Sequence, residues 1–501
     1  MGEHLQRYRE HTGKISSLGQ IAALIDWDQQ TYMPAGAAGA RSEQIGVLSE
    51  LIHSLSTSSE AGDLLKHAED EVAGSDPDSP EARMVSVGRK NYDRSIKLPA
   101  DLVSEISRHC ASAISVWEEA REKSDFSLFA PALKKTFDLT KQAAEYLGYT
   151  DHIYDALIDQ YEPGSTQASV KSMFANLVPH LVKLNAGIAN APQVDDSPIR
   201  GSFSVPQQRA FTLDIASRLG YDLNRGRQDE TAHPFCTSFS KYDVRITTRY
   251  DEQFLQQGLY ATLHEAGHAM YEQGVPDEWQ GTPIGGAASL GIHESQSRLW
   301  ENQVGRSRAF ANWIFPHLKA AFPGSSADTP EAFYRAVNKS EPSFIRVEAD
   351  EVTYNLHIAL RFELECALLS GELAVKDLPA AWNEKMQAYL GITPPDNALG
   401  VLQDVHWAIG LIGYFPTYSI GNLVSAQLWN SAETVIPDLT GKIQRGEFAP
   451  LLAWLNQNVH AHAARFLPHE VVQLATGAPL DPAHYVKYLF GKYSDIYGLS
   501  L

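Results

Sequence analysis

The stretch LYATLHEAGHAMYEQG, residues 259–274, carries three residues whose types and spacing could bind and use a metal ion: His264, Glu265 and His268. Two histidines four residues apart lie on one face of a helix, so both imidazoles can reach one zinc ion. The glutamate between them can take a proton from water on that metal. Alternatively, both histidines are surface or hydrogen-bonded core residues, and the five-residue motif alone does not decide.

The expected third ligand is Glu294. Metalloproteases that use a third histidine carry it shortly after the motif, but AMYEQGVP after His268 contains none. Another class takes a carboxylate from a following helix, and here GTPIGGAASLG leads into IHESQSRLWEN. Neighbouring helical residues point about 100° apart, so we expect His293 to be structural. Two histidines and one glutamate leave a position for water, which is typical of a catalytic metal site.

A helix over 251–273 is expected to hold the two histidines. Leu255, Leu259 and Leu263 recur at four-residue spacing, which gives the helix one apolar face. Gly274 follows, with a proline shortly beyond it, and both residue types end helices. The chain before it, TSFSKYDVRITTRY at 237–250, alternates polar and apolar residues and predicts a strand with one polar face. Its polar set, expected to face a cleft, is Asp243, Arg245 and Thr247.

Most of the remaining sequence has helical periodicity, broken by short clusters rich in Pro, Gly, Ser and Asp. In PGSSADTPEA at 323–332, Asp328 or Thr329 is expected to begin a helix whose first residue is Pro330. The pattern predicts a mainly α protein. We expect residues 1–501 to form a single catalytic unit.

Composition narrows the functional class. The 501 residues carry a formal net charge of −20, which would repel nucleic-acid phosphates and anionic lipid surfaces. We therefore expect neither a nucleic-acid nor a membrane partner. The first residues lack the apolar segment of a secretion signal, and three widely spaced cysteines fit reduced thiols, so a cytoplasmic location is expected.

Several separated motifs together resemble the carboxypeptidase Taq family of metallocarboxypeptidases. HEAGH is followed by HESQSR, and DVRIT matches the family's DxRxT. IRVEAD matches [IV]RxxAD, and GVLQDVHW matches GxxQDxHW. DWDQQTYMP, YDALIDQYEPG and GYFPTYSIGN are also similar to family stretches, so the resemblance covers nearly the whole chain.

The resemblance implies a large helical metallopeptidase fold with a small β element, similar in architecture to angiotensin-converting enzyme and neurolysin. It implies a long substrate groove over the metal site at 264–294, with groove motifs at 243–247, 345–350, 400–407 and 413–422. It further implies release of carboxy-terminal amino acids from peptides, one divalent metal per chain, most often Zn²⁺ and sometimes Co²⁺, and a homodimer.

Within that resemblance, Glu265 is expected to act as the general base, passing the water proton to the leaving amine. His406 and Tyr418 are candidate donors to the developing oxyanion, with Tyr414 as a further candidate. The structural alternatives are a buried His406 bonded to Asp404 and tyrosines that fill the core. The neighbouring tryptophan of the motif, Trp407, is expected to be packing.

The resemblance points to Arg346 as the anchor for the substrate's terminal carboxylate, because a guanidinium binds a carboxylate through two parallel hydrogen bonds. Arg245 could line the same end of the groove. In the alternative interpretation Arg346 pairs with Asp350 one helical turn later, and Arg245 pairs with Asp243.

Two questions stay open at this level. The carboxylate that orients a metal-binding histidine could be Asp350, Asp404 or Glu301. The main functional alternative is an endopeptidase or dipeptidase with the same metal centre, and a second one is a peptide-binding relative without turnover. The intact Glu265 argues against the second, because binding alone needs no base beside the metal.

Overall fold

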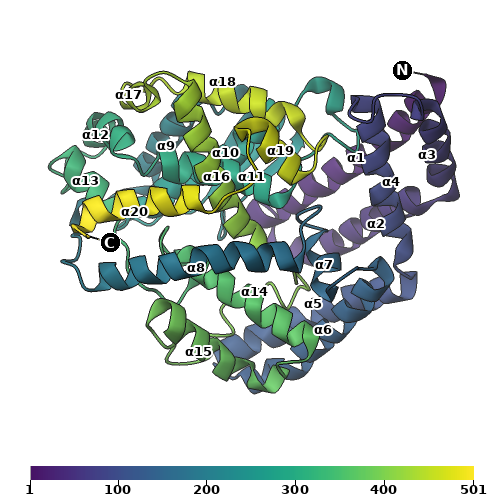
Figure 1. The fold of residues 1–501 in the computed structure, drawn as a ribbon, viewed down its shortest axis with the longest axis horizontal. Helices are drawn as coiled ribbons and strands as arrows, with labels where there is room; N and C mark the ends of the chain where they lie inside the picture. Colours follow the sequence, from purple (N-terminus) through teal and green to yellow (C-terminus); the bar gives the residue numbers. More distant parts are fainter. Residues whose placement is uncertain (1, 501) are drawn as a thin grey trace. The chain divides into compact units, whose positions relative to one another are not determined.

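The computed structural model describes residues 2–500, which form two compact units. The first contains residues up to Ile96 together with Asp196–Val337 and Val424–Pro479, and the rest of the described chain makes the second. Helices dominate both units (Figure 1). Within residues 2–500, one small sheet lies in the first unit. The mainly α class is therefore confirmed, whereas action of residues 1–501 as a single catalytic unit stays a prediction.

The first unit collects helices from three separate parts of the chain. The helix α16, Pro416–Val435, contributes its second half to this unit. Its other helices, apart from the two that carry the candidate ligands, are α1 (Glu3–Thr31), α2 (Ala38–Thr57), α3 (Ser59–Val72), α4 (Pro80–Lys97), α9 (Val205–Leu219), α12 (Arg308–Ala321), α13 (Pro330–Val337), α17 (Leu439–Gln444), α18 (Ala449–Asn458) and α19 (Pro468–Thr476).

The sheet has three strands: β1 (Gly226–Glu230), β2 (Cys236–Ser240) and β3 (Asp243–Thr248). Their order is β1-β3-β2, with β1 parallel and β2 antiparallel to β3. The single strand predicted over 237–250 is wrong in extent, because the chain turns back at 241–242 and makes a hairpin there. The strand β1 was not predicted, since GRQDE has neither apolar alternation nor β-branched residues.

The central strand β3 shows the alternation that its sequence predicts, with one difference. Val244 and Ile246 are fully buried, and β3 packs against the helix that carries the histidines. Asp243 and Arg245 are only partly buried. Thr247 is also fully buried, and its hydroxyl accepts a hydrogen bond from the backbone N–H of Phe235 at 2.8 Å. The polar set therefore does not share one open face.

The histidine-bearing helix is α10, Leu255–Gly274. It starts four residues later than the predicted 251–273, because the Asp251 carboxylate accepts a hydrogen bond from the backbone of Gln253 at 2.7 Å and holds a turn there. Its end agrees with the glycine and proline signals. The three leucines at four-residue spacing are each at most 1% exposed, so the apolar face is in the core as expected.

The second unit is built around α14, Tyr354–Ser370, which is buried on most of its faces. Such a helix packs against neighbours all round, and here these include α6, α7, α8 and α15. The helices α5 and α6 lie side by side (Figure 1). The bounds of these elements are α5 (Ala100–Glu122), α6 (Phe126–Leu147), α7 (Ile153–Ile158), α8 (Gln167–Ala189), α15 (Leu378–Leu390) and α20 (Ala483–Tyr497).

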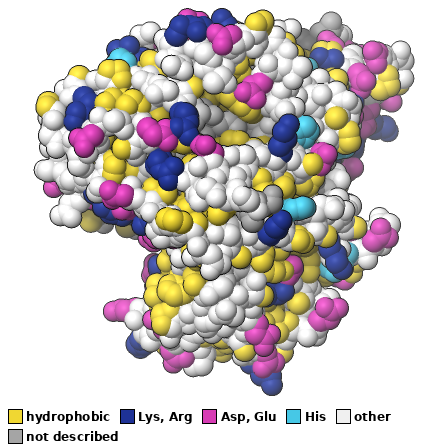
Figure 2. Space-filling model, turned by 60° about the vertical axis from the view of Figure 1, so that its left-hand side comes forward, with side chains coloured by type: hydrophobic (Ala, Val, Ile, Leu, Met, Phe, Trp, Pro, Cys, Tyr) yellow, Lys and Arg dark blue, Asp and Glu magenta, His cyan; other side chains and the backbone are white. Residues whose placement is uncertain are grey.

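Two features of the described residues concern charge and hydropathy. On the face drawn in Figure 2, basic side chains are interspersed with acidic ones. Among residues 2–500, the structure contains no helix that is both long and apolar enough to span a membrane.

Candidate metal centre

The two motif histidines lie on adjacent turns of α10, with ring centroids 4.9 Å apart. The imidazole of His293 stacks on His268 at a centroid distance of 4.4 Å and bonds Glu272 at 2.9 Å. His293 thus stacks on the ring of a candidate ligand, and its structural role stays a prediction.

The helix α11, Leu290–Arg298, brings Glu294 opposite the two histidines. The two helices approach closely at Gly267, where an added Cβ would lie 2.6 Å from the Cα of Ser297 and 2.7 Å from the carbonyl oxygen of Gln296. A glycine inside a helix costs about 1 kcal/mol relative to alanine. At this position it allows the contact that sets the carboxylate against the imidazoles.

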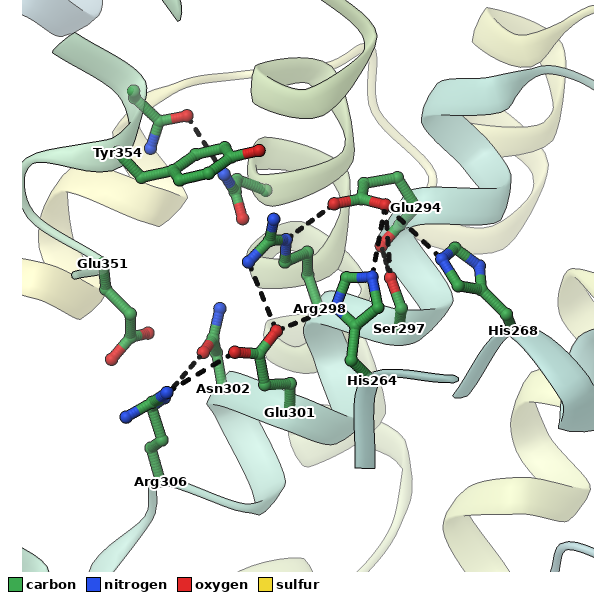
Figure 3. A network of polar contacts seen from close by, with 12 residues as sticks. His264, His268, Glu294, Ser297, Arg298, Glu301, Asn302, Arg306, Glu351 and Tyr354 are labelled. Carbon is green, nitrogen blue, oxygen red and sulfur yellow. Dashed lines mark hydrogen bonds and ion pairs between the residues drawn. The ribbon is translucent and has the colours of Figure 1, made fainter. Parts of the chain in front are cut away.

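One donor atom from each of His264, His268 and Glu294 lies within 4.8 Å of the other two. Glu294 Oε2 is 3.7 Å from His264 Nε2 and 3.5 Å from His268 Nε2 (Figure 3). Zinc bonds to N and O donors of about 2.0–2.2 Å in tetrahedral geometry place neighbouring donors about 3.4 Å apart. The donor set and its separations therefore fit a small divalent cation.

A second carboxylate fixes the orientation of His264. Glu301 Oε2 lies 2.9 Å from His264 Nδ1, which directs Nε2 toward Glu294. Glu301 follows α11 on a π-helical turn, η5 (Leu299–Val304), and contacts Arg306 at 3.5 Å. Of the three carboxylates considered from sequence, Glu301 is thus the one that contacts a candidate ligand within the same unit.

The electrostatics mostly favour the forms that bind metals. Burial lowers the pKa of His268 to about 3, so its imidazole is neutral at pH 7. Burial alone would raise the pKa of Glu294, but Arg298 and His264 hold it well below its usual range. For His264, burial lowers the pKa, but Glu294 and Glu301 together raise it.

Glu265 lies on the same helix as the histidines and is 6% exposed. Burial raises the pKa of Glu265 to about 7, an effect that His264 partly offsets. A carboxyl group with a pKa near 7 can both accept and return a proton at neutral pH. This property suits the role predicted for it.

Arg346 lies in the second unit, in a 3₁₀ turn, η6 (Arg346–Glu348). Its Nε and Nη2 donate to Asp404 Oδ1 at 3.1 and 2.8 Å, and Nη1 donates to the Tyr354 hydroxyl at 3.1 Å. The alternative pairing with Asp350 is wrong. Asp350 instead accepts hydrogen bonds from the backbone of Val352 and Thr353, because the chain at 346–350 is not an α-helix.

The same Asp404 also binds Arg361, which is fully buried. Arg361 Nε donates to Asp404 Oδ2 at 2.7 Å, and Nη2 donates to the Gln403 side chain at 2.8 Å. Two guanidinium groups thus share one carboxylate, so this buried cluster has an excess positive charge. Their attraction holds the pKa of Asp404 far below its usual range despite its burial.

His406, Tyr414 and Tyr418 form a cluster in the second unit. His406 Nε2 is 3.4 Å from the Tyr418 hydroxyl, and His406 Nδ1 is 3.8 Å from Asp404 Oδ1. Burial lowers the pKa of His406 to about 4, so the ring is neutral at pH 7. The 3.8 Å between His406 Nδ1 and Asp404 Oδ1 is too long for the hydrogen bond that the structural alternative requires. Trp407 beside it is 5% exposed, as expected for packing.

Arg245 lies on β3 in the first unit and pairs with Asp243 through two hydrogen bonds of 2.8 Å. Its guanidinium also lies 4.4 Å from the ring centroid of Trp27 and 4.9 Å from that of Phe239. The structural interpretation of Arg245 is therefore realised. A role in substrate binding would have to use the outer edge of the same group.

The family model of the carboxypeptidase Taq (M32) metallopeptidases matches residues 7–493. The chain belongs to this family. Thermostable carboxypeptidase 1 of Thermus thermophilus is 44% identical over 506 residues, with 99% of each chain covered. Carboxypeptidase 1 of Bacillus subtilis is 41% identical, with 97% of each chain covered. The crystal structure of an M32 carboxypeptidase from Deinococcus radiodurans matches with a TM-score of 0.97 at 44% identity, covering 99% of this chain and 100% of that one.

The resemblance predicted from the motifs is thus confirmed over nearly the whole chain. As a member of the M32 family, the chain is a metallopeptidase relative for which a divalent metal is implied. Its helical fold with a small sheet matches the M32 carboxypeptidase structures.

Three residues around these clusters were not predicted: Gly267, Arg298 and Arg361. For Gly267, the available signal was a glycine inside a helical motif, because such a glycine often marks a place where another segment packs closely against the helix. The helical spacing of Arg298 from Glu294 could have suggested their contact. The partner of Arg361 lies 43 residues away in the sequence, and no local pattern indicates it.

Proposed function

We propose that this protein is a zinc-dependent metallocarboxypeptidase that releases carboxy-terminal amino acids from peptides. The observation that carries the proposal is the convergence of two imidazoles and one carboxylate beside the buried Glu265, in a chain of the M32 family. The proposed metal ligands are His264, His268 and Glu294, with one divalent cation per chain. Zn²⁺ is the preferred ion because the donor set is N₂O, and Co²⁺ has similar preferences.

A divalent cation held by these three side chains would lower the pKa of a bound water and polarise the scissile carbonyl. Glu265 then takes the proton of the attacking water and returns it to the leaving amine. Its place supports this assignment, because Glu265 is buried and lies on α10 between the two proposed histidine ligands. Glu301 keeps the proton of His264 on Nδ1, so that Nε2 stays available as a ligand.

Arg346 is the proposed anchor of the substrate's terminal carboxylate, and Arg245 is a second candidate. Asp404 occupies the Nε side of Arg346, which fixes the plane of the guanidinium. The excess positive charge that Arg346 and Arg361 create around one aspartate favours an incoming anion. A peptide with a free carboxy terminus supplies that anion.

His406 and Tyr418 are the proposed donors to the oxyanion. Tyr414 is a further candidate donor and a proposed contact for the substrate. Neutral His406 can donate from one ring nitrogen, and the Tyr418 hydroxyl lies close enough to act with it. Both roles are inferred from the chemistry of the side chains and from the family motif.

Further properties are proposed from the family alone. These are the homodimer and a likeness in architecture to angiotensin-converting enzyme and neurolysin. The cytoplasmic location is proposed from the three widely spaced cysteines, which fit reduced thiols. An endopeptidase or dipeptidase with the same metal centre is the main alternative function. A peptide-binding protein without turnover is less consistent with the intact Glu265, because binding alone needs no base beside the metal.

The test uses one peptide with either a free or an amidated carboxy terminus. Each form is incubated with zinc-loaded and with chelated protein, and the products are followed by mass spectrometry. Stepwise shortening of the free form alone, only with metal, is expected. Internal cleavage of both forms would make the protein an endopeptidase and leave Arg346 without its proposed role. Hydrolysis of a dipeptide, with the longer peptide left intact in both forms, would favour the dipeptidase.

A further inference from the structure

The two oxygens of Glu294 have different partners. Oε2 faces Nε2 of both His264 and His268, at 3.7 and 3.5 Å. Oε1 accepts a hydrogen bond from Nε of Arg298 at 2.7 Å. Figure 3 shows these contacts on separate oxygens of the carboxylate. The side chains of Glu294 and Arg298 are 9% and 15% exposed, so water only weakly screens the pair.

Arg298 also reaches the second carboxylate of the site. Its Nη1 lies 3.2 Å from Glu301 Oε2, the oxygen that bonds His264 Nδ1. One guanidinium therefore contacts two carboxylates, and these contact opposite nitrogens of the same imidazole. The four side chains close a ring in which the position of each group depends on the others.

We propose that Arg298 is a positioning residue that restricts Glu294 to a single metal-binding oxygen, Oε2. The inference rests on the proposed metal site and names how one of its ligands is controlled. A carboxylate can bind a divalent cation through one or both oxygens. An oxygen engaged in a short, charge-assisted hydrogen bond is held away from the cation. The coordination position that Oε1 would take stays open for water or the substrate carbonyl.

Charge leads to the same conclusion. Glu294 and Glu301 bring two negative charges next to the site. Arg298 contacts both carboxylates, whereas Arg306 contacts only Glu301. Without Arg298, Glu294 would lose its guanidinium partner, and the carboxylates would offset more of the charge of a divalent cation, which would then polarise a carbonyl less strongly. Loss of the guanidinium should therefore leave metal binding as tight or make it tighter, while turnover falls. A residue that only supports the fold would lower metal affinity instead.

The neutral variant Arg298→Gln tests this inference, with Arg298→Lys as the variant that keeps a cation near Oε1. Arg218 supplies a matched control. Its Nε donates to Asp214 four residues earlier at 2.8 Å, the same kind of pair, but on the exposed surface of α9. Arg218→Gln should leave every measurement unchanged.

The readouts are the dissociation constant for Co²⁺, the visible absorption of the Co²⁺ protein, and kcat and KM. A second carboxylate oxygen on the ion raises its coordination number and weakens the visible band. We expect Arg298→Gln to bind Co²⁺ at least as tightly as the native protein, with a weaker band and a kcat about 10- to 100-fold lower. Arg298→Lys should recover the native band.

Three outcomes would overturn the inference: a native spectrum in Arg298→Gln, an affinity that falls with kcat, or a lysine variant that behaves like the glutamine one. Failure of the metal site itself is separable. In that case the native protein would bind no stoichiometric Co²⁺, or His264→Ala would bind it equally well.

Discussion

Replacing Asp404 by asparagine should destabilise the second unit strongly. Its carboxylate is shared by Arg346 and Arg361, whose side chains are 5% and 0% exposed, while Asp404 itself is 12% exposed. Asparagine keeps the shape and one acceptor but removes the charge. Two buried guanidinium groups would then face each other without a compensating anion.

The magnitude follows from this burial. Removing one partner of a buried ion pair costs about 3–5 kcal/mol, against a total stability of about 5–15 kcal/mol for most proteins. Arg361→Met is the comparison, because Asp404 then pairs with Arg346 alone and the buried charges balance. That variant loses the hydrogen bonds of Arg361 to Gln403 and to the carbonyl of His357. Its cost should be about 2 kcal/mol.

The assay is urea unfolding at pH 7, followed by circular dichroism, for both single variants and the double variant. The pKa of Asp404 is depressed in the folded protein. Its stabilisation is therefore complete above the unfolded value of about 4, and it is lost only as pH falls toward the depressed folded value. Comparison at pH 7 is thus unaffected by this titration. An Arg361→Met variant as destabilised as Asp404→Asn would refute the charge-balance reasoning.

Three further predictions concern other parts of the structure. Gly267→Ala should force α10 and α11 apart, because the new Cβ would lie 2.6 Å from backbone, and calorimetry should show a lower unfolding temperature together with weaker Co²⁺ binding. Glu301→Gln should lower metal affinity about 10- to 100-fold in a chelator competition, and an unchanged affinity would remove its role in orienting His264. Burial raises the pKa of Glu365 from 4.5 to about 7. The protonated acid is therefore favoured in the fold, and its stabilisation, present below pH 4.5, should decline by about 3 kcal/mol as pH rises to 7. Between pH 4.5 and 7, the free energy of unfolding should fall more with rising pH in the native protein than in Glu365→Gln. The same pH dependence in both proteins would contradict the shift.

Local signals in the sequence located two of the helices. The leucine spacing and Gly274 located α10 and its end, and Thr329 caps α13 at the predicted Pro330 through a 3.1 Å bond to the backbone of Ala332. The start of α10 was missed because a side-chain turn at Asp251 competes with the helix. Such competition leaves little trace in hydrophobic periodicity.

Contacts between segments far apart in the sequence were harder to predict. The grouping of His264, His268 and Glu294 followed from motif spacing, since one glutamate in the next helix could complete the site. The partner of Arg346 was assigned to Asp350 by the helical alternative, yet Asp404 holds it from 58 residues away. The ion-pair partner of a buried arginine is set by the tertiary fold. One sequence does not show which distant carboxylate lies next to it.

The most direct measurement of the central claim is a titration of zinc into the chelated protein, with bound metal and peptide hydrolysis recorded together. Hydrolysis should rise in proportion to bound zinc and reach its plateau at about one ion per chain, the number that one three-donor site can hold. Glu265→Gln should bind the same amount of zinc without turnover. Hydrolysis that does not depend on zinc, or native turnover by Glu265→Gln, would contradict the proposed metal-dependent mechanism.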